Sequence, residues 1–337
     1  MLNIYVIITI IEGGFMKESG KIVSYFKDFD DKNMELKREN GIICIDPSQT
    51  SLEGQRGEVL IYRLKGVPIF VKDFYAEIGE ENAVIYEAVV SKVMNDCGVN
   101  SAPYFYSLKK DKENEYSKLC AFSQSVFDVD GITAFGGDEF VKFVVGTWLE
   151  DYKPNDFWYF VENPKVKPIF LQHMTEECFE QLVDLCLFDE LAGIVDRHFR
   201  NYYFYKLNPE SKKFDGIINI DSAMTWIFSS KGYRKNAQID FDCNFSYFTY
   251  KSFLKITAVG EFSEYSYEES IKRIKKLFNK GVFGERQARL VKNFIESDIA
   301  SQLKSGAEKT NRTMSKAVID LYERVNEYLD QNLQRQL

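Results

Sequence analysis

The chain has 337 residues, enough to bury one large core or two modest ones, since domains usually run to about 100–200 residues each. Its formal net charge of −8 excludes broad binding to nucleic acid or to an anionic membrane surface, because both need a basic footprint. The six cysteines show no CxxC spacing, which disfavours disulfides and a zinc knuckle and predicts a reducing, cytoplasmic compartment. Only two histidines exist, His173 and His198, which disfavours a histidine-ligated metal site and a Ser-His-Asp triad.

Residues 1–15 carry no functional signal. Leu2–Ile11 is an apolar run that is too short to span a bilayer and lacks the charged start of a signal peptide, so we expect no stable membrane insertion. The segment is either a strand or a membrane-proximal piece, or it is disordered or untranslated. In the last case Met16 is the true start, and Glu12–Phe15 are encoded by a ribosome-binding site. The intact mass of the natively expressed protein distinguishes these hypotheses.

A β-rich segment with a pair of glycines comes next. Residues 58–63 and 67–72 show the alternation that predicts the two strands of a hairpin. The loop before them, residues 47–57, holds Gly54 and Gly57, which can bring backbone amide groups close to a phosphate. Two glycines at this spacing are also common in ordinary turns. The sequence contains no GxxxxGK[ST] motif, which disfavours a P-loop nucleotide-binding protein.

Lys72 ends the second strand and is a candidate ligand of phosphate. Its candidate partner is Glu87, on a predicted helix whose apolar residues recur from Ile85 to Cys97 and which ends at Gly98. Glu87 borders the apolar stripe, so it can point toward the sheet. A strand lysine held by a helix glutamate contacts the α- and β-phosphates of ATP in protein kinases. Without a nucleotide site, both would be ordinary flanking residues.

Residues 104–108 and 119–124 predict a second hairpin. From about Ser123 the chain then crosses into a second lobe, and main-chain groups at this crossing would receive an adenine ring. We therefore expect an α+β, two-lobed fold. Its β-rich N-lobe, with one long helix, would span residues 16–126, and its mainly helical C-lobe residues 127–337.

The C-lobe is predicted to contain one central helix. Thr175 is a candidate N-cap for a helix that runs to about Leu191 and ends at Gly193. This helix is apolar on nearly every side, which is typical of a buried element. Ile194 and Val195 then lead the chain into a polar turn.

Three oxygen-bearing side chains are placed on two neighbouring strand ends beyond that helix. Asp196 and Asn201 precede a short strand, and Asp221 follows the predicted strand Ile217–Ile220. Phosphoryl transfer needs such a set: an Asp near the attacking hydroxyl, with an Asn and a second Asp that hold magnesium on the nucleotide phosphates. We interpret His198 as a structural histidine that braces the loop.

Two strings of residues carry a resemblance to a known family. Gly193-x-x-Asp196-Arg197-His198-x-x-Asn201, followed by Ile218-Asn219-Ile220-Asp221, resembles the catalytic and metal-binding segments of the HipA-type bacterial serine/threonine kinases. The likeness extends more remotely to phosphoinositide kinases. The strand lysine, the helix glutamate and the crossing near Ser123 occur in the same order, so the resemblance spans about residues 48–250.

The resemblance implies a protein-kinase-like fold, ATP and Mg²⁺ as ligands, and a role for each candidate residue. Asp196 would orient or deprotonate the hydroxyl of a protein substrate. Asn201 and Asp221 would ligate Mg²⁺. Lys72, held by Glu87, would bind the phosphates of ATP.

The resemblance also implies regulation and a partner, although the match has departures. HipA kinases silence themselves by phosphorylating the loop beside the glycines, which makes Ser48, Thr50 and Ser51 candidate autophosphorylation sites. An antitoxin would be the expected partner. However, Asp221 is not followed by the glycine of a DFG motif, and the large amino-terminal subdomain of HipA toxins is absent. The shorter, stand-alone HipA-like kinases are therefore the closer comparison, and a toxin role is left open.

Two alternatives to a protein kinase follow from the next basic segment. Lys231, Arg234 and Lys235 lie where a kinase carries its activation segment. They could receive a peptide, hold the headgroup of a lipid, or form ordinary solvated surface. The alternatives are thus a phosphoinositide or small-molecule kinase, and a non-catalytic nucleotide-binding module.

The remaining chain predicts helices that complete the C-lobe. Ser266 and Glu269 have the spacing of a capping box at the start of the first. A second would span about residues 285–303, and a last one would carry apolar residues at core spacing from Met314 to Tyr328.

Overall fold

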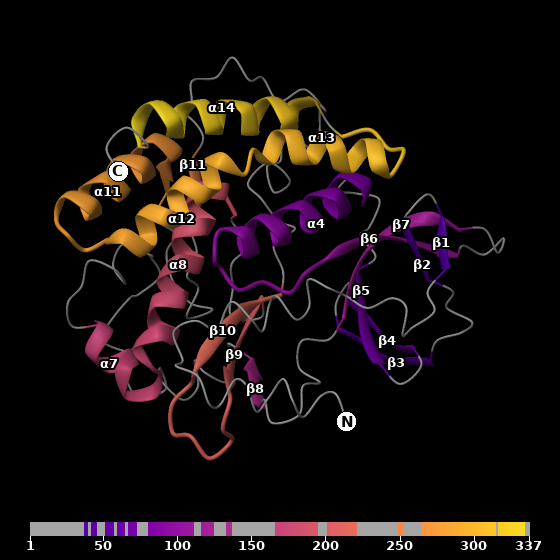
Figure 1. Ribbon diagram of the computed structural model, residues 1–337, viewed down its shortest axis with the longest axis horizontal. Coiled ribbons are helices and arrows are strands. Elements are labelled where there is room, and N and C mark those ends of the chain that lie inside the picture. Colours follow the sequence, from indigo (N-terminus) through magenta and orange to yellow (C-terminus); the bar gives the residue numbers. More distant parts are fainter. Residues whose placement is uncertain are drawn as a thin grey trace.

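The computed structural model describes residues 37–39, 42–45, 51–56, 59–64, 67–72, 80–110, 116–124, 133–136, 166–194, 201–220, 249–251, 264–314 and 316–333. Residues 1–15 and the predicted crossing between lobes, at residues 125–132, lie outside this part of the chain. Figure 1 shows strands β1 to β7 on one side of the molecule and helices α7, α8, α11 and α12 on the other.

A seven-stranded sheet forms most of the amino-terminal part that the structure describes. Its strands are β1 (Lys37–Glu39), β2 (Ile42–Ile45), β3 (Ser51–Arg56), β4 (Val59–Leu64), β5 (Val67–Lys72), β6 (Phe105–Lys110) and β7 (Tyr116–Gln124), in the order β1-β2-β6-β7-β5-β4-β3. Strands β2 and β6 run parallel, and the other neighbours are antiparallel. Both hairpins expected from the sequence, β4–β5 and β6–β7, are present.

The prediction of a loop over residues 47–57 is wrong for residues 51–56, which form strand β3. Gly54 pairs with Ile61 of β4, and the register shifts between Leu52 and Gly54. A glycine inside a strand often marks such an irregularity, because it has no side chain to keep in register.

Helix α4 (Glu80–Asp96) packs on β6 and β7. It ends as the sequence predicts. Gly98 adopts a φ of +84°, and Val99 N donates to Met94 O at 2.8 Å. Such a left-handed residue favours glycine, and the bond satisfies a carbonyl of the last helical turn.

A second, three-stranded sheet is joined directly to the segment that follows α4. Its strands are β8 (Thr133–Gly136), β9 (Tyr202–Lys206) and β10 (Gly216–Asn219), in the order β10-β9-β8. On its free side β10 meets residues 100–102: Asn219 N donates to Asn100 O at 2.9 Å, and Ala102 N donates to Asn219 O at 2.8 Å. The connection from α4 to β6 thus acts as a neighbouring strand of β10.

Helix α8 (Glu176–Ala192) is the buried central helix that the sequence predicts, and α7 (Val166–His173) packs beside it. The side chain of Thr175 accepts a hydrogen bond from Cys178 N, and Gly193 ends the helix with a φ of +69°. Every residue from Gln181 to Ala192 is buried. The burial includes polar side chains, which an all-apolar interpretation of this helix does not anticipate.

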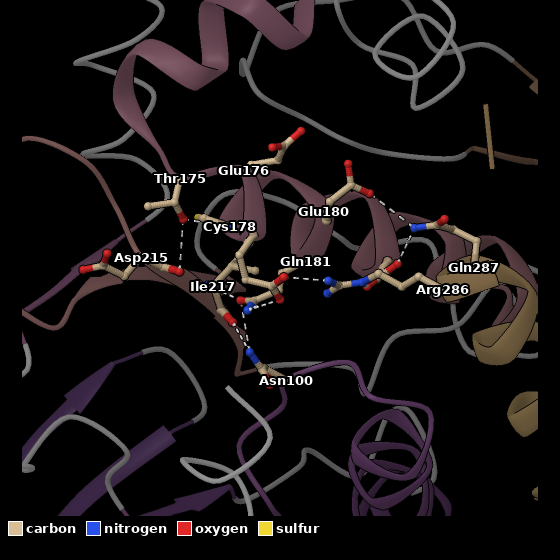
Figure 2. A network of polar contacts seen from close by, with 12 residues as sticks. Asn100, Thr175, Glu176, Cys178, Glu180, Gln181, Asp215, Ile217, Arg286 and Gln287 are labelled. Carbon is tan, nitrogen blue, oxygen red and sulfur yellow. Dashed lines mark hydrogen bonds and ion pairs between the residues drawn. The ribbon is translucent and has the colours of Figure 1, made fainter. Parts of the chain in front are cut away.

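Gln181 connects α8 to strand β10 and to the segment after α4, as Figure 2 shows. Its Oε1 accepts from Ile217 N at 3.0 Å and from Asn100 Nδ2 at 3.1 Å, while its Nε2 donates to Glu177 Oε1 at 3.0 Å. Buried polar groups stabilise a fold only when they are hydrogen-bonded, and all three contacts satisfy that condition. The network sets the position of β10 against the central helix.

The same network reaches α12 (Glu285–Glu296) through Arg286. The guanidinium donates to Asp184 Oδ2 at 2.5 Å and to Glu177 Oε2 at 2.8 Å, and Gln287 Nε2 donates to Asp184 Oδ1 at 3.0 Å. Burial raises the pKa of Asp184 to about 6, although Arg286 and Gln287 act to lower it. The ion pair therefore offsets only part of the cost of burying this carboxylate.

This raised pKa gives a pH dependence of stability. The folded protein holds the Asp184 proton up to about pH 6, whereas an unfolded chain releases it near pH 4. The stability that the proton supplies is complete below pH 4 and lost as the pH rises through 6. Between these values we expect the free energy of unfolding to fall by about 3 kcal/mol relative to Asp184→Asn. Urea unfolding of both proteins at a series of pH values measures this. If the wild type instead gained stability relative to Asp184→Asn as the pH rose, the ion pair with Arg286 would dominate over the cost of burial.

The carboxy-terminal part is helical after a small hairpin of β11 (Thr249–Lys251) and β12 (Glu264–Ser266). Helices α11 (Tyr267–Asn279), α12, α13 (Ile299–Lys309) and α14 (Lys316–Asn332) follow. The prediction of one helix over residues 285–303 is wrong. The chain breaks at Asp298, which adopts a φ of +44° and caps α13 by accepting from Ser301 N. Aspartate tolerates this conformation and satisfies a free amide, so it ends one helix and begins the next.

No helix among the described residues combines the length and the apolar character that crossing a bilayer requires.

Candidate functional site

Lys72 and Glu87 form a buried ion pair. Lys72 Nζ lies 2.9 Å from Glu87 Oε1, and the two side chains are only 3% and 0% exposed. Strand β5 delivers the lysine from the middle of the sheet, where Lys72 pairs with Val59 of β4 and Ala121 of β7. Moving two charges out of water is costly, and such a pair rarely stabilises a fold more than apolar side chains would. A functional role would explain why this costly ion pair is present. Both side chains are candidate phosphate-site residues from the sequence.

Tyr104 connects this ion pair to the strand that precedes Asp221. Lys72 Nζ lies 4.6 Å from the centre of the Tyr104 ring, a cation–π distance. The hydroxyl of Tyr104 donates to Ile220 O at 2.9 Å, and its backbone N donates to Ser91 Oγ of α4 at 3.1 Å. The carbonyl that Tyr104 holds belongs to the peptide bond between Ile220 and Asp221. The ammonium therefore contacts the ring, and that peptide the hydroxyl, of one tyrosine side chain.

Asn201 lies beside the same peptide. Its backbone O accepts from Ile220 N at 2.9 Å, one step beyond the pairing of Tyr202 with Asn219 in the β9–β10 ladder. Asn201 is buried, with 7% of its surface exposed. The side chain of Asn219 donates to Ser101 Oγ at 2.9 Å, which anchors the end of β10 to the segment after α4. Lys72, Glu87 and Asn201 are thus connected through Tyr104 and Ile220.

The other predicted site residues are placed less completely. Ser123 is buried in β7 opposite Phe70 of β5, one residue before the strand ends. Gly54 lies in β3, at the far side of the sheet from β7, with β4 and β5 between them. Three predicted site residues lie outside the described part of the chain: Gly57, Asp196 and Asp221. His198, interpreted as a structural histidine, also lies outside it. The roles assigned to all these residues stay predictions.

Tyr104 was missed from the sequence because nothing in its neighbourhood marks it. Alternation within residues 104–108 predicts a strand but does not say which side chain meets Lys72. The sequence did contain a signal for a different feature, the hydrogen-bond network around α8, because Gln181 and Asp184 interrupt an apolar helix. Polar residues on a helix that is buried all round predict an internal network of hydrogen bonds.

Comparison with known proteins supports the fold and leaves the activity to be proposed. No protein-family model matches the sequence, and no curated protein matches it. The structure is similar to the crystal structure of the proinflammatory kinase CtkA of Helicobacter pylori, with a TM-score of 0.55, 15% identity, and 87% of this chain and 96% of that chain covered. The chain has a kinase-like fold.

A second comparison is weaker. HipA of Shewanella oneidensis MR-1, solved in a toxin–antitoxin complex with HipB and operator DNA, gives a TM-score of 0.39 and 12% identity over 80% of this chain and 57% of that chain. A TM-score this low does not establish a shared fold. The likeness to CtkA, in contrast, supports a kinase-like fold for this mixture of helices and strands.

Tyr104 gives a prediction that separates its two contacts. Tyr104→Phe removes only the hydrogen bond to Ile220 O, whereas Tyr104→Leu also removes the ring beside Lys72. We expect the free energy of unfolding to fall in the order wild type, Phe, Leu, with about 1 kcal/mol lost in the Phe variant. Urea unfolding measures both losses. Tyr106→Phe is the matched control, because that ring lies against Gly306 of α13. Equal stability of the Phe and Leu variants would remove the ring contact from the account.

Proposed function

We propose that the protein is an ATP- and Mg²⁺-dependent protein serine/threonine kinase. The observation that carries the proposal is the buried ion pair of Lys72 and Glu87. The Lys72 ammonium lies against the ring of Tyr104, and the Tyr104 hydroxyl donates to the carbonyl of the peptide before Asp221. This arrangement suits a ligand that is a polyphosphate bound to a divalent cation. The kinase-like fold that the chain shares with CtkA supports the same class of chemistry.

Each candidate residue has a role in the proposal. Lys72, held by Glu87, neutralises charge on the α- and β-phosphates of ATP. Asn201 and Asp221 supply oxygen ligands for Mg²⁺, since hard cations prefer carboxylate and amide oxygens. Asp196 accepts or orients the proton of the attacking hydroxyl. ATP supplies the phosphoryl group.

The nucleotide base and the phosphate loop are assigned by position. Main-chain groups at and after Ser123 face the adenine, because β7 ends beside β5, which carries Lys72. The β3–β4 hairpin, with Gly54 in β3 and Gly57 next along the sequence after β3, covers the phosphates. Both assignments follow from the resemblance to HipA-type kinases and from strand order.

The proposed substrate is a protein hydroxyl, and one acceptor is the chain itself. Ser48, Thr50 and Ser51 immediately precede or begin β3, the strand that carries Gly54. A phosphate placed there would add about two negative charges beside the proposed phosphate site and repel ATP. Phosphosite mapping after incubation with Mg·ATP tests this assignment, and phosphate found only elsewhere in the chain would reject it. An antitoxin partner stays a prediction from the sequence.

The test of the proposed function follows labelled phosphate from ATP into three fractions. Purified protein is incubated with labelled ATP and Mg²⁺, with a generic protein substrate and with phosphoinositide vesicles in parallel. The proposal predicts label in protein and none without Mg²⁺. Label in the organic phase would indicate a lipid kinase, and label in a small soluble product a metabolite kinase. No transfer together with no thermal stabilisation by Mg·ATP would contradict both the activity and nucleotide binding.

A further inference from the structure

The helix that carries Glu87 is buried on nearly every side around that residue. From Ala83 to Met94 every residue of α4 except Lys92 is buried. A helix that only covers a sheet leaves a polar stripe in solvent, so α4 must have a second cover. That cover is α13, which packs along α4, with α14 packed on α13 (Figure 1). The position of Glu87 therefore depends on the carboxy-terminal helices as well as on the sheet.

Close contacts show how tightly α13 approaches α4 and the neighbouring strand. A Cβ at Gly306 of α13 would lie 2.4 Å from the hydroxyl oxygen of Tyr106 and 3.0 Å from a methyl carbon of Ile85. Near the other end of α4, Lys92 Nζ donates to Gln302 Oε1 at 3.2 Å. Small residues at such points let helices pack at short range, so α4 has little freedom to shift away from α13.

A chain of two hydroxyl groups joins α4, α14 and the end of α8. Tyr322 of α14 donates to Ala192 O at 2.8 Å, and the hydroxyls of Tyr86 and Tyr322 lie 2.7 Å apart. Because Tyr322 uses its only proton on Ala192, Tyr86 is the donor to Tyr322. Both phenols are buried, and burial raises the pKa of each above its usual range. Both hydroxyls therefore keep their protons at neutral pH.

The Tyr86 and Ala192 ends of this hydrogen-bonded series both lie near residues of the proposed site in the sequence. Tyr86 is the residue before Glu87, so an anchored Tyr86 limits rotation of α4 about its own axis. Ala192 belongs to the last turn of α8, where carbonyl groups lack a partner within the helix. Tyr322 supplies that partner from another helix. Beyond Ala192 the chain turns at Gly193 and leads within four residues to Asp196.

We infer that Tyr322 is a positioning residue for phosphoryl transfer: its hydroxyl holds the helix of Glu87 in register with the end of α8 that leads to Asp196. The inference rests on the proposed function. Tyr322 touches neither nucleotide nor substrate in this account, and it acts through Glu87 on one side and Asp196 on the other. Helix α14 then helps to hold Glu87 in place to pair with Lys72.

The test compares three variants in steady-state kinetics. Tyr322→Phe removes both hydrogen bonds, and Tyr86→Phe removes only the one that reaches α4. We expect Tyr322→Phe to lower kcat about tenfold with KM for ATP changed less than about threefold, because geometry and not affinity is lost. Tyr86→Phe should lower kcat less. The double variant should match Tyr322→Phe, since both act through the same contact.

A matched variant separates positioning from general destabilisation. Leu329→Ala removes a buried side chain from the same helix, about 10 Å from Tyr322 along the axis. It should lower the melting temperature at least as much as Tyr322→Phe while kcat, measured well below both transitions, stays near wild type. Equal losses of kcat in the two variants, or a Tyr322→Phe kcat within twofold of wild type, would overturn the inference.

A second readout keeps the inference distinct from the proposed function. Amide hydrogen exchange reports the hold on α4 without any turnover. Tyr322→Phe should speed exchange in residues 83–94 and 189–194 and leave α12 unchanged. If the wild type transfers no phosphate but this pattern appears, the proposed function fails while the structural tie stands. If exchange is unchanged, the tie itself is absent.

Discussion

Replacing Lys72 by methionine is expected to abolish phosphate transfer and to weaken the fold at once. The ammonium is the proposed ligand of the α- and β-phosphates, and it is also the partner of a fully buried carboxylate. Removing one member of a buried ion pair usually costs about 3–5 kcal/mol, because the other charge loses its partner while still buried. A loss of activity in Lys72→Met alone would therefore not separate catalysis from unfolding.

The double variant Lys72→Met, Glu87→Gln makes the separation. It removes both charges, so we expect most of the lost stability to return while phosphate transfer stays more than about 100-fold below wild type. Urea unfolding and labelled-phosphate assays measure the two effects. Lys92→Met is the control. It removes an exposed lysine of α4, the helix that carries Glu87, where Lys92 contacts Asp96 and Gln302, and it should cost less than about 1 kcal/mol. Full activity in the double variant would exclude Lys72 from the site.

Asp196→Asn and Asp221→Asn are each expected to lower phosphate transfer more than about 100-fold, with the fold retained. Asn in place of Asp221 keeps the size of the side chain but removes the charge that attracts Mg²⁺, so this variant should also need more Mg²⁺ for any residual activity. Asn in place of Asp196 cannot take a proton. Its KM for ATP should change little, because Asp196 is assigned to the hydroxyl and not to the nucleotide.

The control for both variants is Glu210→Gln, which removes one carboxylate from the exposed turn between β9 and β10. It should transfer phosphate at the wild-type rate. Wild-type turnover in either aspartate variant would show that the site is wrongly assigned, even if the protein proved to be a kinase.

Local rules predicted the elements that carry the candidate site. The Thr175 cap and the Gly193 stop set the limits of α8 correctly, because capping depends on a few neighbouring residues. The same holds for the end of α4 at Gly98. Helical spacing predicted that Glu87 points toward the sheet, and the structure shows its contact with Lys72.

Long-range contacts could not be predicted in this way. Tyr322 and Tyr86 lie 236 positions apart, and no local pattern relates a tyrosine of the last helix to one beside Glu87. The break at Asp298 was missed because the apolar pattern is nearly continuous across it, while the left-handed turn there depends on one aspartate. The strand at residues 51–56 was missed because its glycine indicated a loop, whereas pairing with β4 decided the outcome.

The central claim is that this chain transfers phosphate from ATP to a protein hydroxyl. The most direct measurement is intact mass spectrometry of phosphatase-treated protein before and after incubation with ATP and Mg²⁺, with Asp221→Asn treated in parallel. The account predicts a gain of one or more phosphate groups in the wild type, and none in Asp221→Asn or in the wild type with the metal chelated. An unchanged wild-type mass, with no label reaching an added protein substrate, would contradict it.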